Sequence, residues 1–336
     1  MPPLINGYTQ KTKEKNGIAS LEYIELGGIK QLVLIRGDNI NNPILLYLHG
    51  GPGTPCIPLS KKIRDLEKDF VVVLWDQRGT GNSYSKNMDI SDYSIDKYVS
   101  DAERLLRYLV GKYQKKKAYI LGQSWGTVIG TKLSQKVPEL IHAFISIGQV
   151  VNWKENEQLS YKYVIDQAKA DNNKQAINVL MKVKPLYTDD KNKLKYDDLI
   201  LERSWLGYYG GIANKRIKNP SGMDDSDFFD QTEYSIFDLL KVKARSKKSL
   251  VNMWNELSTF DAEKEIPEID VPVYFFVGLH DYNTPFELTY RYYDNLKAPM
   301  GKKLIKFENS GHVLIFEEYS KFKNELRNVV QETNNG

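Results

Sequence analysis

The most constraining feature of the sequence is a pair of glycine-rich segments, each of which follows a short apolar run. The segment Gly122-Gln123-Ser124-Trp125-Gly126 has the Gly-x-Ser-x-Gly spacing of a sharp turn between a strand and a helix, which exposes the serine at its tip. The segment His49-Gly50-Gly51-Pro52-Gly53 follows the run 44–48, where a backbone N–H can face a developing oxyanion. A nucleophile and an oxyanion donor at two strand ends indicate acyl transfer.

Short apolar runs bounded by turn residues predict strands, and stretches with helical spacing between them predict helices. An antiparallel pair is expected at 18–24 and 31–36. Strands buried on both faces of a parallel sheet are expected at 44–48, 70–75, 118–121, 143–147, 271–277 and 303–307. Helices are expected at 95–113, 124–136 and about 316–330. The alternation predicts an α/β fold, with a mostly parallel, doubly wound sheet of about eight strands.

The pattern changes between residues 151 and 256, which are polar, rich in aromatic side chains and helical in texture. This stretch contains no run that is typical of a buried strand. We therefore expect an α/β core formed by residues 1–150 and 257–336. The inserted residues 151–256 are expected to form an all-helical cap, or lid, over the strand ends.

Ser124 needs a general base, and the sequence contains only four histidines. His312 follows the last predicted strand, and it alone can complete the order serine, acid, histidine that accompanies this turn. His49 is expected to brace the glycine loop and His142 to lie in a strand, whereas His280 precedes the candidate acid. The sequence therefore predicts His312 as the base.

The acid should hold the imidazole and stabilise its charged form, so it must lie at a neighbouring strand end. Asp281 follows the apolar run 273–277 at the end of the penultimate strand. The other suitable strand end is followed by Gly148 and carries no carboxylate. Glu308 is nearer to His312 in sequence, but it closes the last strand, where a solvated position is expected. We therefore predict Asp281 as the acid.

The predicted triad is Ser124, Asp281 and His312. The backbone N–H groups of Gly51 and Trp125 are the predicted oxyanion donors. Arg78, which follows another predicted strand, is expected to brace the loops beneath the site through a carboxylate. Since no cluster of histidine, cysteine and carboxylate side chains has metal-ligand spacing, neither a metal nor a cofactor is expected.

Composition narrows the class of protein and its partners. The 47 basic and 43 acidic residues give a net charge of +4, with both signs spread along the chain, so nucleic acid is not expected as a partner. No apolar stretch approaches the roughly 20 residues that span a bilayer, and no membrane partner is predicted. The single cysteine, Cys56, cannot form an intrachain disulfide and is disfavoured as a nucleophile beside Ser124. With no signal peptide apparent at Met1-Pro2-Pro3, we predict a cytoplasmic protein of open oligomeric state that acts on a small molecule or short peptide.

Five motifs together resemble the proline iminopeptidase-like branch of the α/β-hydrolase superfamily. They are the two glycine-rich segments, Trp75-Asp76-Gln77-Arg78-Gly79-Thr80-Gly81-Asn82-Ser83, Gly278-x-x-Asp281 and Ser310-Gly311-His312. The resemblance extends from about residue 20 to residue 330. It implies a metal-independent serine peptidase that releases an N-terminal residue, usually proline, from short peptides.

The resemblance also implies that glutamates of the cap hold the free amino group of the substrate. In the family one such glutamate is typically adjacent to a tryptophan, whereas Glu202 here lies three residues before Trp205. Glu233, next to Tyr234 on a predicted cap helix, is the first candidate and Glu202 the second. Other acidic residues of the cap that could take this role are Asp224, Asp225, Asp227 and Asp230.

Two other functions are compatible with the same residues. A carboxylesterase or lactonase would keep the chemistry and act on a small ester, and a binding protein on a hydrolase scaffold would keep only the fold. Haloalkane dehalogenase and epoxide hydrolase chemistry is disfavoured, because those reactions require a carboxylate where Ser124 stands.

Overall fold

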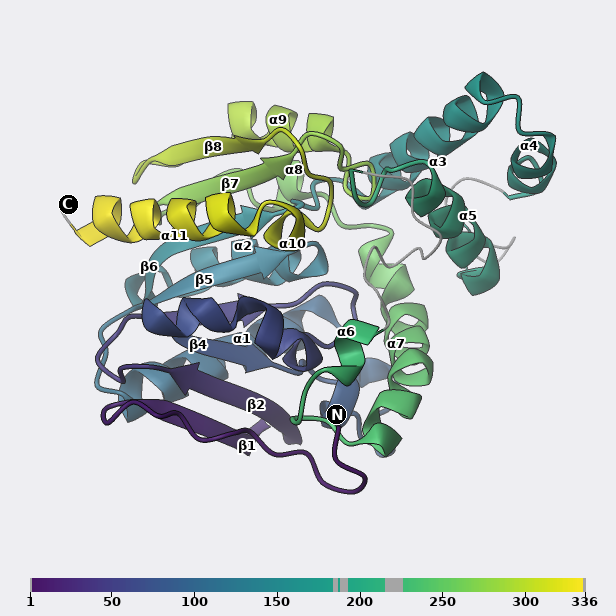
Figure 1. Ribbon diagram of the computed structural model, residues 1–336. Coiled ribbons are helices and arrows are strands. Elements are labelled where there is room, and N and C mark those ends of the chain that lie inside the picture. Colours follow the sequence, from purple (N-terminus) through teal and green to yellow (C-terminus); the bar gives the residue numbers. More distant parts are fainter. Residues whose placement is uncertain (1, 184–186, 188–192, 215–225, 335–336) are drawn as a thin grey trace.

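A computed structural model describes residues 2–183, 187, 193–214 and 226–334, and these residues form an eight-stranded sheet with helices on both faces (Figure 1). The strands are β1 (Ile18–Leu26), β2 (Ile29–Gly37), β3 (Ile44–Leu48), β4 (Val71–Trp75), β5 (Ala118–Gln123), β6 (Ile141–Ile147), β7 (Val273–Gly278) and β8 (Lys302–Phe307). Their spatial order is β1-β2-β4-β3-β5-β6-β7-β8. β2 pairs antiparallel with β1 and β4, and the other neighbours are parallel. The predicted fold class is confirmed.

Helices cover the two faces of the sheet. In the core they are η1 (Ile57–Lys68), η2 (Gly81–Ser83), η3 (Ile90–Asp92), α1 (Ile95–Lys112), α2 (Trp125–Lys136), η4 (Pro138–Leu140), α8 (Ala262–Glu265), α9 (Phe286–Asn295), α10 (Leu314–Glu317) and α11 (Tyr319–Asn334). Residues of α1, α2 and α9 pack on one face, and residues of η1 and α11 pack on the other. The sequence analysis had not predicted the 3₁₀ helix η1, which has proline in its first turn.

Strand β4 shows why the buried strands read as continuous apolar runs. Val71, Val73 and Trp75 belong to the core on the α1 and α2 side, whereas Val72 and Leu74 belong to the core on the η1 and α11 side. Successive side chains of a strand point to opposite faces, so a strand covered on both faces needs apolar residues at every position.

Residues 151–256 connect β6 to β7, and their described part carries α3 (Trp153–Ala170), α4 (Lys174–Leu180), α5 (Tyr196–Tyr208), α6 (Ser226–Phe229) and α7 (Ile236–Leu257). We refer to residues 151–256 as the insertion. In Figure 1, α3, α4 and α5 project beyond the sheet at the end where the parallel strands finish, and α7 runs past the ends of the neighbouring strands. No helix of the described residues is long and apolar enough to cross a membrane.

A buried ion pair joins β4 to α1, as the sequence analysis expected for Arg78. Its Nε donates to Asp101 Oδ2 at 2.8 Å, and both side chains are almost fully buried. Gln31 donates to the same carboxylate oxygen from β2, and Arg78 also donates to the carbonyl of Asp92. These contacts hold the loop after β4 against the sheet.

We expect Asp101→Ala to lower the free energy of unfolding by about 3–5 kcal/mol, because it leaves the Arg78 guanidinium buried without its carboxylate. The matched control is Asp166→Ala, which removes the partner of Lys162 from an exposed i,i+4 pair and should cost less than about 0.5 kcal/mol. Chemical denaturation of the three proteins measures both values. Similar losses in the two variants would contradict a structural role for the Arg78 pair.

Candidate active site

Ser124 lies on a strained turn between β5 and α2. Its φ of 53° and ψ of −123° are unusual for a residue with a side chain, and its N–H donates to the carbonyl of Ile147 at 2.8 Å. Gly126 makes this turn possible, because a Cβ at that position would collide with the carbonyl oxygen of Leu48 at the end of β3. The first turn of α2 therefore lies directly on the end of the neighbouring strand, which is the arrangement expected of a nucleophile elbow.

His312 and Asp281 form a buried hydrogen-bonded pair. The Nδ1 atom of His312 lies 2.8 Å from Asp281 Oδ2 and 3.1 Å from Thr284 Oγ1, and Thr284 Oγ1 itself donates to Asp281 Oδ2. The backbone N–H groups of Asn283 and Thr284 donate to Asp281 Oδ1. Because an ionised carboxylate can only accept, Nδ1 of His312 carries the proton and Nε2 keeps its lone pair.

Gly148, which follows β6, leaves the space that His312 occupies. A Cβ at this position would lie 2.9 Å from Nδ1 and Cε1 of the imidazole and from the hydroxyl of Thr284, and its φ of 58° also favours glycine. The sequence analysis noted only that this strand end carries no carboxylate. The structure adds that even a methyl group there would crowd the histidine.

The glycine loop after β3 is braced by His49. Its Nε2 accepts a hydrogen bond from the N–H of Gln77, so Nδ1 carries the proton and donates to the carbonyl of Gly50 at 2.8 Å. Gln77 also donates to the carbonyl of His49 and accepts from the indole N–H of Trp125. Burial lowers the pKa of His49 to about 4, which keeps the ring neutral. His49 thus holds the loop and is not placed to transfer protons to a substrate.

The two predicted oxyanion donors come from this loop and from the start of α2. Among the described residues, neither the N–H of Gly51 nor that of Trp125 has a hydrogen-bond partner. Gly51 lines the same cavity as Ser124, and Trp125 is the first residue of α2, where backbone N–H groups have no partner within the helix. Both groups are therefore available to an incoming oxygen.

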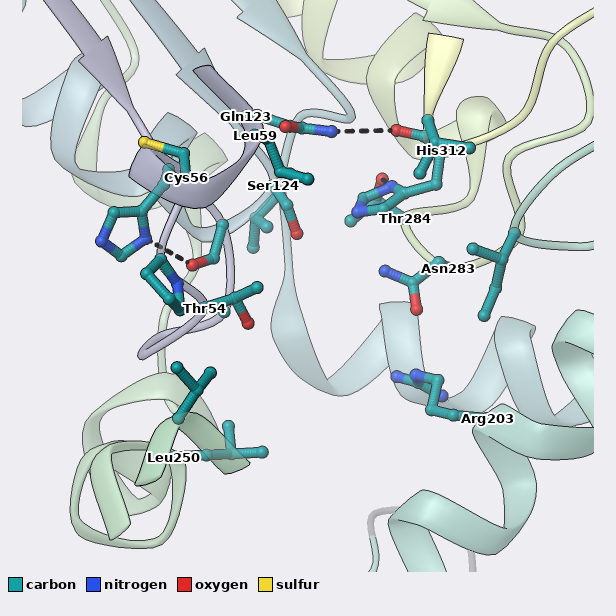
Figure 2. Close-up of a pocket in the computed structure, with 18 of the residues that line it drawn as sticks. Thr54, Cys56, Leu59, Gln123, Ser124, Arg203, Leu250, Asn283, Thr284 and His312 are labelled. Atoms are coloured by element: carbon teal, nitrogen blue, oxygen red, sulfur yellow. Dashed lines mark hydrogen bonds between the residues drawn. The ribbon is translucent and has the colours of Figure 1, made fainter. Parts of the chain in front are cut away.

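Ser124 and His312 open into a cavity of about 800 Å³ between the strand ends and the insertion (Figure 2). Figure 2 shows the Ser124 hydroxyl on the side of the cavity that His312 occupies. Asp281 lies behind His312 and does not line the cavity. Such a volume lies in the range of about 300–1,000 Å³ typical of pockets for small molecules. The structure thus brings Ser124 and His312 to one cavity, with Asp281 hydrogen-bonded to the far side of the His312 ring.

One wall of the cavity carries a charged cluster that the sequence analysis missed in part. Arg203 of α5 donates to Glu157 of α3 at 2.6 Å and also to Glu202, and all three side chains are largely buried. Glu157 and Arg203 line the cavity, whereas Glu202 lies behind them. Burial raises the pKa of Glu157. No sequence motif marks Glu157, because α3 and α5 bring it to Arg203 across 46 residues of chain.

Asn156, next to Glu157 in sequence, also lines this wall. Its Nδ2 donates to the carbonyl of Asn283 at 2.9 Å and to Glu157 Oε1 at 3.3 Å, which orients the amide. Asn156 therefore joins the Glu157 carboxylate to the loop that follows the candidate acid.

Glu233, the first cap candidate, does not lie in the cavity. It precedes α7 instead of lying on a helix, and its carboxylate accepts hydrogen bonds from the Thr9 hydroxyl and from the N–H of Thr232. Arg64 lies 3.7 Å from the same carboxylate. The sequence pattern could not show that the N-terminal segment runs beside this loop and donates a hydrogen bond to the Glu233 carboxylate.

Of the remaining acidic candidates of the cap, only Asp230 has a described side chain. Asp230 is exposed and pairs with Lys61 at 2.7 Å. Asp224 and Asp225 lie outside the described residues, as does the side chain of Asp227. Cys56 lines the cavity but is buried, and burial raises the pKa of its thiol, which disfavours the reactive thiolate.

The two remaining histidines lie outside the cavity. His142 stacks on Tyr119 in the neighbouring strand, with ring centroids 4.9 Å apart, and the Nε2 atom of His280 lies 3.1 Å from the carbonyl of Glu308. Within the described residues, no group of three or more histidine, cysteine or carboxylate side chains could hold a metal ion.

The neutral state of His49 predicts a pH dependence of stability. The folded-state pKa of about 4 lies below the usual value of about 6.5, so the unfolded chain binds more protons between these values. Stability should therefore fall as the pH drops from 6.5 to 4, by about 3 kcal/mol from this group. The variant His49→Gln, compared with the parent by denaturation at several pH values, should lose this part of the slope. An unchanged slope would contradict the assignment of a neutral His49 in the folded protein. Both proteins contain the other titrating groups, such as Asp76, so the contribution of those groups cancels when the two slopes are subtracted.

Comparisons with known proteins agree with this geometry. A family description of the alpha/beta hydrolase fold matches residues 43–319. The chain is 31% identical over 316 residues to the probable aminopeptidase YbaC of Bacillus subtilis, covering 93% of this chain and 96% of the relative. It is 24% identical over 281 residues to a proline iminopeptidase of Heyndrickxia coagulans, covering 82% and 85%.

Solved structures show the same fold at low sequence identity. A proline iminopeptidase-related protein from Thermus thermophilus superimposes with a TM-score of 0.66 at 19% identity, covering 94% of this chain and 98% of the other. An esterase from Exiguobacterium antarcticum gives a TM-score of 0.58 at 18% identity, covering 92% and 99%. The family match and the relative in Bacillus subtilis show that the chain belongs to the alpha/beta hydrolase fold family, in which it is similar to proteins named as aminopeptidase and proline iminopeptidase.

Proposed function

We propose that this protein is a serine hydrolase that releases N-terminal residues from short peptides and aminoacyl amides. The observation that carries the proposal is the pairing, at one cavity, of a nucleophile elbow and an Asp–His pair with a buried, net acidic wall. The names of the relatives, an aminopeptidase and a proline iminopeptidase, support the same activity.

In the proposed mechanism, Ser124 attacks the scissile carbonyl while His312 Nε2 takes the proton of its hydroxyl. Asp281 holds the ring through Nδ1 and stabilises the imidazolium that forms. The N–H groups of Gly51 and Trp125 stabilise the oxyanion. His312 then gives its proton to the leaving amine. In the second half of the reaction, water attacks the acyl-enzyme while His312 takes its proton, and His312 returns this proton to the Ser124 oxygen as the acid is released.

The charged wall is proposed to receive the free amino group of the substrate. Glu157, Glu202 and Arg203 carry a net charge of −1 when both carboxylates are ionised, and a buried net charge is costly until a partner arrives. An ammonium group that reaches Glu157, which lines the cavity, would balance this charge. A carboxylic ester without an amino group leaves the charge unbalanced, which favours an aminopeptidase over an esterase.

Ser124→Ala should lower kcat by roughly 10⁴-fold or more, because no other group can form the acyl-enzyme. Circular dichroism should show an unchanged fold, since the substitution removes one hydroxyl at the cavity surface. Cys56→Ala serves as the control and should retain activity within a few-fold. Labelling by a fluorophosphonate probe checks the same point, because the parent should react and Ser124→Ala should not. A parent that stays unlabelled and inactive would favour a binding protein.

Glu157→Gln should lower kcat/KM for alanine or proline p-nitroanilide by roughly 10- to 100-fold, since a hydrogen bond to a charged group contributes about 1.5–3 kcal/mol. p-Nitrophenyl butyrate, which has no ammonium, should be hydrolysed as before. The matched control is Glu155→Gln on the same helix, whose carboxylate pairs with Arg291 outside the cavity. Equal effects on both substrates would mean that Glu157 shapes the site without recognising an amine.

The same pair of substrates yields a pH signature. Because burial raises the pKa of Glu157, its carboxylate loses charge at a higher pH than an ordinary glutamate. The ratio of kcat/KM for the anilide to that for the ester should therefore fall as the pH is lowered and the Glu157 carboxylate takes up a proton. Any pH effect on the catalytic steps that the two substrates share cancels in the ratio. A parent that hydrolyses only the ester would support the esterase alternative.

A further inference from the structure

The cavity is lined by two walls of different chemistry on either side of the reacting residues. The charged wall consists of Asn156 and Glu157 of α3, Arg203 of α5, and Asn283. The opposite wall, here called the apolar wall, consists of Leu59 of η1, Phe228 of α6, and Leu239, Val242 and Leu250 of α7. In Figure 2, Arg203 and Leu250 lie on opposite sides of the space next to Ser124 and His312.

The side chains of the apolar wall are held in place by the rest of the fold. Leu239 and Val242 pack against one hydrophobic core, and Leu250 packs against the other. These core contacts fix the positions of the three side chains. The helix that carries them is also held in place, because Ser246 donates to the carbonyl of Gly53 and Ser249 donates to the carbonyl of Gly79. Apart from the exposed Lys243, no charged side chain among the described lining residues lies on α6, α7 or η1.

The geometry of an aminoacyl substrate decides which part meets this wall. The α-ammonium is separated from the scissile carbonyl carbon by a single carbon atom, so a substrate anchored on the charged wall keeps its N-terminal residue there. The group beyond the scissile bond must then leave Ser124 in another direction. A volume of about 800 Å³ also exceeds what a single small N-terminal residue fills.

We propose that the apolar wall is a subsite for the leaving group, and that the substrates are aminoacyl amides or short peptides with a bulky apolar group directly after the scissile bond. This inference rests on the proposed aminopeptidase activity. Burial of apolar surface in the subsite strengthens binding of the leaving group, and each buried methylene can raise kcat/KM by up to about four-fold. A cationic group in the same place would lose hydration without gaining a partner, and it would meet the like charge of Lys243.

The test uses N-methyl, N-propyl and N-hexyl amides of L-alanine and L-proline, because alkyl amines of different length are leaving groups of nearly equal basicity. We expect kcat/KM to rise by roughly 10- to 100-fold from the methylamide to the hexylamide. Replacing the terminal methyl of the hexyl chain by an ammonium group should abolish the gain. Leu239→Ala and Leu250→Ala should each lower the ratio of hexylamide to methylamide by roughly five- to ten-fold.

The matched control is Leu240→Ala, since this neighbour of Leu239 on α7 is 71% exposed and does not line the cavity. It should leave both kcat/KM values unchanged. Hydrolysis of every amide at one rate would overturn the leaving-group subsite while the aminopeptidase activity stands. No hydrolysis of any amide would overturn both proposals. A gain that follows a larger N-terminal residue, with norleucine methylamide faster than alanine hexylamide, would mean that the apolar wall binds the acyl side and would also overturn the inference.

Discussion

The close contact between the first turn of α2 and the end of β3 is the constraint on which the rest of the site depends. The backbone at Gly126 approaches the carbonyl of Leu48 so closely that no side chain fits between them. This contact places the Ser124 turn beside the glycine loop, which continues directly from β3. It brings the nucleophile and the Gly51 N–H to the same cavity, so the spacing of two parallel strands sets the geometry of the proposed chemistry.

The insertion holds this arrangement from two sides. Its segment 211–214 binds the loops that carry the acid and the histidine, because the carbonyls of Gly211 and Ile212 accept hydrogen bonds from the N–H groups of Tyr282 and His312. Its helix α7 binds the glycine loop on the other side through Ser246. The same residues that enclose a substrate thus support the loops that would act on it.

Burial raises the pKa of two carboxylates near the cavity, Asp76 and Glu157, which differ in their surroundings. Asp76 lies at the end of β4, where burial raises its pKa to about 7, and its carboxylate accepts hydrogen bonds from the Tyr234 hydroxyl and the Asn82 N–H. That network is internal and joins the core to the segment before α7. Glu157 is also buried, but it lines the cavity, whereas Asp76 does not. Asp76 thus connects two parts of the fold, and Glu157 is placed where a bound molecule can meet it.

The sequence by itself determined where the strands lie, the order in which the candidate serine, acid and histidine follow them, and so the identity of the candidate triad. Each of these depends on local pattern: apolar runs form buried strands, and Ser124, Asp281 and His312 each follow such a run. Parallel strands finish at one edge of the sheet, so residues far apart in sequence were predicted to meet. The chemistry of the insertion was decided only by the tertiary structure. Glu233 accepts a hydrogen bond from Thr9, which lies 224 residues earlier in the chain. Glu157 accepts one from Arg203 because α3 packs against α5. Helical periodicity shows which residues share a face, but the partner of that face depends on how the helices pack, and no local signal carries that information.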